Sequence, residues 1–447
     1  MSTQPLPSGP RFAPLQTYRF IRKPSDLFLD CRARYGDPFT LPLPMGNVVV
    51  TGSPEGLREV FSADPNLFES LGQLPLVPVV GENSLLLMGG QRHKRERKLL
   101  MPPFHGERMR AYGQLMHDLT VRLSSTLLRP GTPLRAQDLT QAISLEIIIR
   151  AVFGIEEPER VRRYQEVLTA YLESYTPLLI AAVPLRRSFG GVGPWARFQR
   201  QVAALDALLT EELATRRGHE AGHTDILSLL LAARHEDGQP MTDSELKDEL
   251  RTLLIAGHET TALGMAWALH HLHHEPQTLQ RLLEELAPLG PQPEPEALMK
   301  LPYLGAVCDE TLRLHPIVIV VGRRTLAPFT LRGRELPVGT AIMASIWLAH
   351  HDPATYPDSQ RFQPERFLER KFSPFEYLPF GGGARRCIGA AFALYEMRVV
   401  LGTLLASHRF SLIPDRTPER PVRRNVTFGP SQGAQLMYAG PRQGALA

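Results

Sequence analysis

A single cysteine lies in a glycine- and arginine-rich stretch, FGGGARRCIG at residues 380–389, whose composition suits metal binding. The glycines allow positive φ angles and a close approach of the backbone to a flat ligand. The apolar run at residues 390–405 predicts a helix, so Cys387 should lie near its amino end, where free N–H groups and the dipole stabilise negative charge. We therefore expect an ionised thiolate that can bind a metal. The alternative is a small buried core residue.

A second polar group, AGHETT at residues 256–261, interrupts a strongly apolar helical pattern. Burying Glu259 and Thr260 in a helix costs free energy unless both have partners. An acid beside an alcohol can relay protons to a reacting oxygen. The alternative is structural: Glu259 faces solvent, and Thr260 bonds to a carbonyl one turn earlier.

Two further pairs of residues are spaced so that both members lie on one face of a helix. Glu310 and Arg313 are three residues apart and by themselves predict a modest ion pair. His93 and Arg97 are four apart in QRHKRERK at residues 91–98, so they share a face while the other basic side chains spread around the helix. Taken alone, this basic segment indicates a solvated helix.

Periodicity indicates which elements position these residues. Residues 39–51 alternate around a Met-Gly-Asn turn and predict a hairpin. From about residue 111 to 286, apolar residues recur at helical spacing. Residues 330–347 and 410–437 return to strand-like composition, and the proline-rich residues 288–295 predict a surface loop.

Length and composition limit the classes of protein to which this chain can belong. A chain of 447 residues with 43% hydrophobic content can bury a large core. The cysteines, Cys31, Cys308 and Cys387, are odd in number and far apart, which argues against a disulfide framework or a cysteine-rich zinc site and favours a reducing cytosol. A net charge of +4 gives no sign of nucleic-acid binding. No signal-peptide pattern and no run of ~18 apolar residues is evident, so we expect no transmembrane anchor.

Phe380, Gly383, Arg385, Cys387 and Gly389 fit the pattern F-x-x-G-x-R-x-C-x-G, and the other groups precede it in order. The composite resembles the cytochrome P450 superfamily, the haem-thiolate monooxygenases, over about the whole chain. The resemblance implies that haem b is the cofactor, with Cys387 as axial iron ligand, Arg385 on a propionate, and Phe380 and Gly389 in the haem-binding loop. An axial thiolate pushes electron density toward the opposite face of the iron and favours O–O cleavage.

By the same resemblance, AGHETT is the oxygen-binding helix. Ala256 and Gly257 would contact the haem, with Gly257 leaving room for O₂ over the iron. Thr260 would donate a hydrogen bond to dioxygen, and Glu259 would help to relay protons.

The basic helix resembles the segment that supports the haem propionates, so His93 and Arg97 become haem contacts. Arg323 occupies the place of another propionate-binding arginine. Arg324 is the alternative if the match slips by one residue.

Glu310 and Arg313 resemble the E-x-x-R helix of the superfamily, and residues 362–367, FQPERF, resemble its later P-E-R-F element. Arg366 would complete a structural triad with the other two side chains. Its role would be folding and haem retention rather than chemistry.

The resemblance implies a mainly α fold, a helical triangular prism with a minor β domain and the haem between the oxygen-binding helix and the cysteine loop. We expect a single domain over residues 1–447. Its small β-rich part would cover about 35–62 and 317–347, and its helical body about 90–315 and 387–406.

The implied activity is that of a monooxygenase that hydroxylates or epoxidises a small molecule. The segments that line the cavity in this fold are nearly all apolar here, which favours a fatty acid, terpenoid or steroid-like substrate, unless these residues simply pack the core. They are Leu74, Leu76, Val77, Val79, Val80, Tyr171, Leu172, Tyr175, Leu178, Leu179, residues 317–321 and residues 426–428.

Other haem functions remain as rivals. Peroxide-using haem-thiolate peroxygenases, and isomerases or dehydratases of hydroperoxides, typically lack the acid–alcohol pair that Glu259 and Thr260 form. A non-catalytic haem sensor gives no reason for that pair.

The chain has no room for a reductase module and no convincing dinucleotide-binding fingerprint, so electrons must come from a separate protein. The resemblance places the basic helix on the cysteine side of the haem, where Arg92, Lys94, Arg95, Lys98 and Arg386 would form a positive patch. We expect an acidic ferredoxin or flavodoxin, with its reductase, as the donor. The protein is expected to be cytoplasmic and of a bacterial type.

Overall fold

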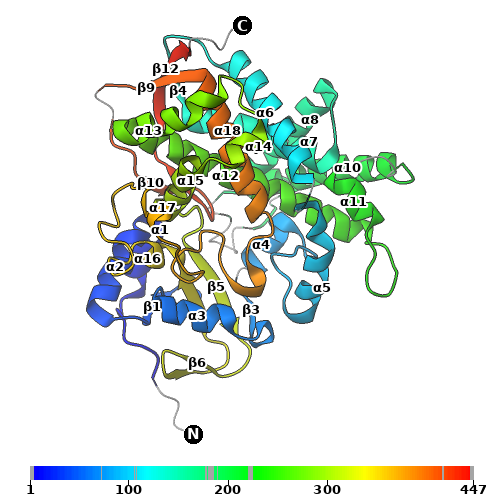
Figure 1. Ribbon diagram of the computed structural model, residues 1–447. Coiled ribbons are helices and arrows are strands. Elements are labelled where there is room, and N and C mark those ends of the chain that lie inside the picture. Colours follow the sequence, from blue (N-terminus) through cyan, green and yellow to red (C-terminus); the bar gives the residue numbers. More distant parts are fainter. Residues whose placement is uncertain are drawn as a thin grey trace.

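Helices make up most of the computed structural model, with smaller sheets toward one side (Figure 1). It describes residues 5–71, 73–104, 106, 108–176, 179, 186–188, 190–219, 225–414 and 417–442, without the side chains of 73–75. The helices are α1 (Ala13–Arg22), α2 (Pro24–Tyr35), α3 (Pro54–Ser62), α4 (Gln73–Val80), α5 (Gly90–Leu100), α6 (Arg108–Leu127), α7 (Ala136–Phe153), α8 (Pro158–Ser174), α10 (Pro194–Arg216), α11 (Ile226–Ala232), α12 (Asp243–His274), α13 (Pro276–Leu286), α14 (Pro295–Met299), α15 (Pro302–Leu314), α16 (Ile346–His350), α17 (Arg366–Glu369) and α18 (Ala390–Ser407).

The strands join early and late parts of the chain. The largest sheet has the order β1-β2-β8-β5-β3, with β2 and β8 parallel and the other neighbours antiparallel. A second sheet has the order β4-β12-β9, and β6–β7 and β10–β11 form pairs. The strands are β1 (Phe39–Leu43), β2 (Gly46–Thr51), β3 (Phe68–Ser70), β4 (Thr132–Arg135), β5 (Val320–Thr325), β6 (Phe329–Leu331), β7 (Arg334–Leu336), β8 (Ala341–Ser345), β9 (His408–Leu412), β10 (Pro421–Arg423), β11 (Phe428–Pro430) and β12 (Gln435–Pro441).

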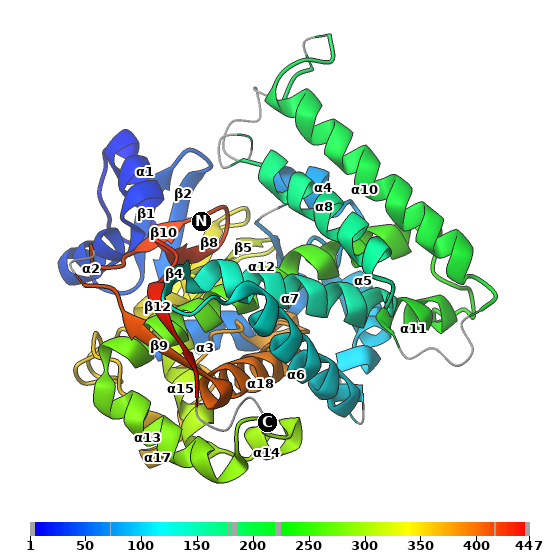
Figure 2. The ribbon, with the colours of Figure 1, turned by 90° about the horizontal axis from the view of Figure 1, so that it is seen from above.

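The long helix α12 crosses the middle of the molecule between α7 and the sheets (Figure 2). Its 32 residues span about 48 Å, and a capping box between Thr242 and Glu245 defines its start. Side chains of α7 hold its backbone: Thr140 Oγ1 donates to the carbonyl of Ala262 (2.9 Å) and Ser144 Oγ to that of His258 (3.1 Å). These bonds set the rotation of α12 and therefore which of its residues face which neighbour.

Most of the predicted elements are confirmed. The hairpin forms from β1 and β2, with Phe39 opposite Val50, and helices dominate residues 111–286. The strand region expected up to residue 347 ends earlier, at Ser345. The reason is a helix cap, because Ser345 Oγ accepts a hydrogen bond from the N–H of Leu348 (3.2 Å) and so starts α16.

One helix in the described residues, α18, is long and apolar enough to span a membrane by length and composition, although Glu396 and Arg398 interrupt its apolar run. In the structure, 72% of this stretch is buried inside the protein. Its apolarity is therefore that of a core helix, packed against α6, α12 and α15.

Candidate haem-binding and oxygen-activating site

The glycines of the cysteine loop let it pack tightly against α3. Gly383 has a φ of 65°, and a Cβ there would lie 2.2 Å from the carbonyl oxygen of Phe61. The N–H of Cys387 donates to the carbonyl of Phe380 (2.9 Å), which closes the loop just before α18 begins at Ala390. The predicted helix after the cysteine is therefore confirmed.

Cys387 differs from the other cysteines in exposure. Cys31 and Cys308 are buried, and burial raises their thiol pKa values to about 11 and about 12, whereas the Cys387 side chain is accessible. Surrounding protein nevertheless raises the pKa of Cys387, and this outweighs the Gly389 N–H and the Arg97 and Arg386 guanidinium groups, which lower it. The expectation that the protein alone ionises this sulfur is wrong. Coordination to a metal cation would deprotonate the thiol.

A cluster of cations lies close to this loop. Burial lowers the pKa of His93 to about 4, helped by the charges of Arg385, Arg97 and Arg323. Burial also lowers the pKa of Arg323 to about 10, and the charge of Arg385 contributes. Among the residues that the structure describes, no carboxylate forms an ion pair with these three arginines. We call Arg97, Arg323 and Arg385, together with the neutral His93 beside them, the cationic cradle.

An uncompensated group of buried or half-buried guanidinium groups costs free energy, so the cradle requires an anionic ligand. Carboxylates match guanidinium groups in charge and geometry, and haem carries two propionates. The cradle and the accessible Cys387 thiol thus fit haem. The cradle would bind the two carboxylates, and the thiol would bind the iron.

The two arginines of strand β5 lie on opposite sides of the strand. Arg323 is 8% exposed and points into the cradle, where its charge is felt by His93. Arg324 points to the other side of the strand and pairs with Glu69 (3.4 Å). Because successive side chains of a strand face opposite sides, only one of the two can join the cradle.

Arg385 also holds a segment of the chain in place. Its guanidinium donates to the carbonyl oxygens of Leu86 (2.8 Å) and Met88. These residues lead into α5, which carries His93 and Arg97. Arg385 therefore positions the two members of the cradle on α5, as well as adding its own charge.

On α12, Ala256 is exposed and Thr260 is half-buried, whereas most of the following turns of this central helix are buried. The Thr260 hydroxyl donates to the carbonyl of Ala256 (2.7 Å), which is the local bond that the structural alternative predicts. Thr261 is buried and donates to the carbonyl of Gly257 (3.2 Å). The two adjacent threonines therefore face different surroundings.

Gly257 has a packing role in addition to the role predicted from the sequence. A Cβ on this residue would lie 2.8 Å from Cδ1 of Ile148, which belongs to α7. The glycine is therefore needed for the close approach of two helices. That it also leaves space for O₂ over the iron stays a prediction.

The Glu259 carboxyl group is partly buried and does not face open solvent. Burial raises its pKa, while the Arg424 guanidinium and the Thr427 hydroxyl lower it. Arg424 in turn donates to Gln137 Oε1 (2.8 Å), which fixes its position. An acid with a raised pKa beside an arginine can hold a proton and release it.

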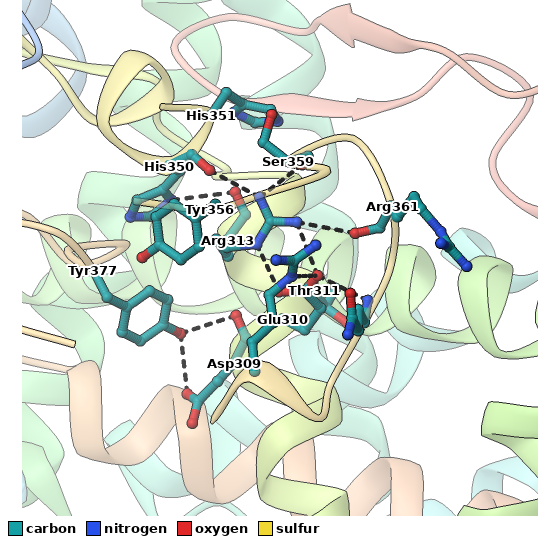
Figure 3. Close-up of polar contacts among 12 residues, drawn as sticks. Asp309, Glu310, Thr311, Arg313, His350, His351, Tyr356, Ser359, Arg361 and Tyr377 are labelled. Atoms are coloured by element: carbon teal, nitrogen blue, oxygen red, sulfur yellow. Dashed lines mark hydrogen bonds and ion pairs between the residues drawn. The ribbon is translucent and has the colours of Figure 1, made fainter. Parts of the chain in front are cut away.

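Glu310, Arg313 and Arg366 form the predicted triad. Glu310 accepts from Arg313 Nε (2.6 Å) and Nη2 (2.8 Å), and Arg366 Nε lies 3.5 Å from the same carboxylate. Arg313 is fully buried and also donates to the carbonyls of His350 and Ser359, both at 2.8 Å (Figure 3). The triad therefore ties α15 to the segments around residues 350–363, as expected for a structural role.

Sequence reasoning missed one anchor of the site. Asp248 on α12 accepts from the N–H of Asn83 (3.0 Å), and Glu249 accepts from the N–H of Leu85 (2.7 Å). Burial raises the pKa of Glu249 to about 8. No local signal marked this pair, because Asp248 and Glu249 lie in a stretch rich in charged residues, DSELKDELR at residues 243–251, unlike Glu259 in its apolar surroundings. These bonds fix the segment that joins α4 to α5. Arg385 donates to backbone carbonyls of the same segment.

The expected substrate-lining segments partly converge. Tyr171 donates its hydroxyl to the carbonyl of Val79, which joins α8 to α4, and the N–H of Phe428 donates to the carbonyl of Ile317 (2.9 Å). Val426, by contrast, is 49% exposed and lies at the surface. The side chain of Leu74 and all of Leu178 lie outside the described residues.

Comparison with known proteins agrees with this geometry. The cytochrome P450 family model matches residues 4–437. A Mycobacterium tuberculosis protein named "Putative cytochrome P450 135A1" is 35% identical over 444 residues, covering 97% of this chain and 95% of its own length. A Mycobacterium bovis protein named "Putative cytochrome P450 135B1" is 35% identical over 451 residues, covering 99% of this chain and 93% of its own.

A solved structure, described as retinoic acid bound cyanobacterial CYP120A1, superposes with a TM-score of 0.86 at 25% identity, over 98% of this chain and 100% of its own. The chain belongs to the cytochrome P450 family. It is thus a haem-binding monooxygenase with the predicted mainly α fold. Its activity requires dioxygen, a substrate and a source of electrons.

Proposed function

We propose that this protein is a haem-thiolate monooxygenase that hydroxylates or epoxidises an apolar molecule such as a fatty acid, terpenoid or steroid. The observation that carries the proposal is the exposed Ala256 and the half-buried Thr260 on a mostly buried central helix, next to the half-buried acid Glu259. Haem bound through the Cys387 thiolate would supply O₂ activation, because a thiolate ligand favours O–O cleavage.

The other predicted site residues have separate roles in this proposal. Phe380 and Gly389 shape the loop on either side of Cys387. The cationic cradle neutralises the two propionates, with Arg323 rather than Arg324 as its third arginine. On the opposite side Ala256 forms the cavity wall, and Gly257 supports it by letting α12 lie close to α7.

Glu259 and Thr260 would deliver protons to one side of the reacting oxygen. The raised pKa of Glu259 lets its carboxyl group carry a proton, and Arg424 stabilises the carboxylate after release. The Thr260 hydroxyl must leave the Ala256 carbonyl to donate onward. This acid–alcohol pair supports a monooxygenase over a peroxide-using enzyme, which needs no separate proton delivery of this kind.

An apolar substrate is supported by the residues that converge beside α4 and α8. Val79, Val80 and Tyr171 are buried and apolar in character, and the Tyr171 hydroxyl is satisfied by a backbone carbonyl. These three side chains belong to the main core, so the half-buried Leu76 and Val77 of α4 would be the apolar side chains here that meet a ligand, and binding would remove apolar ligand surface from water. The solved relative is described as bound to retinoic acid, an isoprenoid acid, which fits the same class.

The test uses a panel of fatty acids, terpenoids and steroids, screened by the Soret shift that ligand binding causes, and then turnover with any compound that binds. Product containing one oxygen atom from O₂ is expected. Thr260→Ala should keep haem and substrate binding but lower coupling, the product formed per NAD(P)H consumed, by about tenfold, with hydrogen peroxide as the other product.

Thr261→Ala is the matched control, because this adjacent threonine bonds to the carbonyl of Gly257 in buried surroundings. Its coupling should stay within about twofold of the parent. Equal coupling in the parent and Thr260→Ala would exclude the hydroxyl from the relay. Sugars or nucleotides as the only binders would contradict the apolar substrate.

The electron donor is proposed to be an acidic ferredoxin or flavodoxin that docks near α5. Arg92, Lys94, Arg95 and Lys98 are all exposed, as is Arg386 beside the cysteine. Two of them have local partners: Arg92 donates to Asn83 Oδ1 (2.7 Å), and Lys98 lies 3.9 Å from Glu236. Lys94 and Arg95 are therefore the better positions for a test.

Lys94→Glu with Arg95→Glu should slow the first electron transfer from an acidic ferredoxin by about tenfold at low salt, because charge complementarity raises association rates. The salt dependence should flatten, while substrate-induced spectra remain unchanged. Arg129→Glu with Arg334→Glu, two exposed arginines on other elements, is the control. An unaltered rate and salt slope in the first variant would place the docking site elsewhere. A cytoplasmic location is also proposed, since the two buried cysteines are unpaired thiols.

A further inference from the structure

Of its large apolar side chains, helix α1 packs Phe20 against the core and turns the others outward. Its inner face carries Gln16, 6% exposed, whose Oε1 has no hydrogen-bond partner in the described part of the chain. Its outer side, with the residue before the helix, carries large apolar side chains. These are Phe12, Leu15, Tyr18 and Ile21, with exposed fractions of 66%, 49%, 62% and 46%. A surface helix normally turns its apolar stripe inward.

These side chains lie together along one short segment of the surface. Leu15 and Tyr18 are three residues apart, as are Tyr18 and Ile21, so they follow one side of the helix. Phe12 directly precedes the first turn. Figure 2 shows α1 at the outer margin of the molecule, beside β1 and β2 and far from α10. A contiguous exposed patch of this kind marks an interaction site.

The charges at the two ends of this patch are positive. Arg11, Arg22 and Lys23 flank it and are exposed, and the helix contains no acidic residue. Arg19 is the exception among its cations, because it is paired with Asp30. Aromatic and aliphatic side chains on one face with cations at both ends are the composition of helices that lie in the headgroup region of a bilayer.

We propose that the outer face of α1 binds peripherally to an anionic lipid surface. Phe12, Leu15, Tyr18 and Ile21 would enter the headgroup–acyl boundary, while Arg11, Arg22 and Lys23 would pair with lipid phosphates. A second copy of the chain is the less favoured occupant. In a two-fold symmetric dimer the same patch of each copy would meet. The flanking cations of the two copies would then lie close together and repel each other.

The test is sedimentation of the full-length holoprotein with vesicles of phosphatidylcholine, with and without phosphatidylglycerol. Binding should be at least about tenfold stronger to the anionic vesicles at low salt and should fall as salt rises. Leu15→Glu with Tyr18→Glu should reduce binding to anionic vesicles by at least about tenfold, since it puts two negative charges into the interface.

The control is Leu326→Glu with Val338→Glu, which adds the same charge at apolar residues that are 51% and 59% exposed between β5 and β8. It should bind vesicles nearly as the parent does. The carbon monoxide spectrum of every variant reports whether fold and haem are intact. Equal binding of both double variants, or no binding by the parent, would overturn the proposal. So would concentration-dependent dimerisation that the α1 variant abolishes, because the face would then belong to a second copy.

Discussion

Cys387→Ala is expected to abolish the strongly red-shifted Soret band that the dithionite-reduced protein should show with carbon monoxide. The band requires a thiolate on the iron, and Cys387 is the exposed cysteine of the three. Turnover should fall below detection, because the axial thiolate is what favours O–O cleavage. Haem content should fall as well, although the cationic cradle remains to hold the propionates.

Cys31→Ser and Cys308→Ala are the controls. Both cysteines are buried, and burial raises their thiol pKa values, so neither can reach an accessible metal without a change in the fold. Both variants should keep the red-shifted band at full intensity per haem. A red-shifted band that persists in Cys387→Ala and disappears in Cys31→Ser or Cys308→Ala would overturn the assignment of the iron ligand.

Arg313→Ala is expected to prevent stable folding or haem retention. Its guanidinium is completely buried and bonds to the Glu310 carboxylate and to the carbonyls of His350, Ser359 and Arg361. Removing one partner of a buried ion pair leaves an uncompensated charge and costs about 3–5 kcal/mol. The carbonyls that lose their donor add to this cost. Urea unfolding followed by circular dichroism and by haem absorbance measures the loss.

The matched control is Arg370→Ala, which breaks a largely exposed ion pair with Glu376 in the same part of the chain. Exposed pairs contribute at most about 1 kcal/mol, so this variant should fold and retain haem. Glu310→Gln, which keeps the shape but removes the charge, should destabilise the protein less than Arg313→Ala. Wild-type stability of Arg313→Ala would show that the triad does not hold this region together.

Much of the fold followed from local patterns. Apolar spacing at 3.6 residues predicted the helical body, because each helix must turn an apolar stripe to a common core. Strand composition was a weaker guide at the end of β8. A single serine that caps α16 converts residues 346 and 347 from expected strand to helix, and this depends on one side-chain bond.

The pairing of α12 with its neighbours could not be predicted. Gly257 is a glycine because Ile148 of α7 lies against it, and Asp248 and Glu249 are acidic because Asn83 and Leu85 present backbone N–H groups to them. Each contact joins residues more than a hundred positions apart. Spacing within one helix carries no information about which distant segment packs on it.

The sequence by itself determined the chemistry available to this protein: a loop cysteine, an acid–alcohol pair on a helix, and the E-x-x-R and P-E-R-F elements, all within short motifs whose meaning depends on local spacing. Only the tertiary structure decided which arginine of β5 joins the cradle, that Cys387 is not ionised by its protein surroundings alone, and that α1 turns most of its large apolar side chains outward. Strand register, desolvation and helix orientation are set by the packing of distant segments, so they arise only when the whole chain is folded.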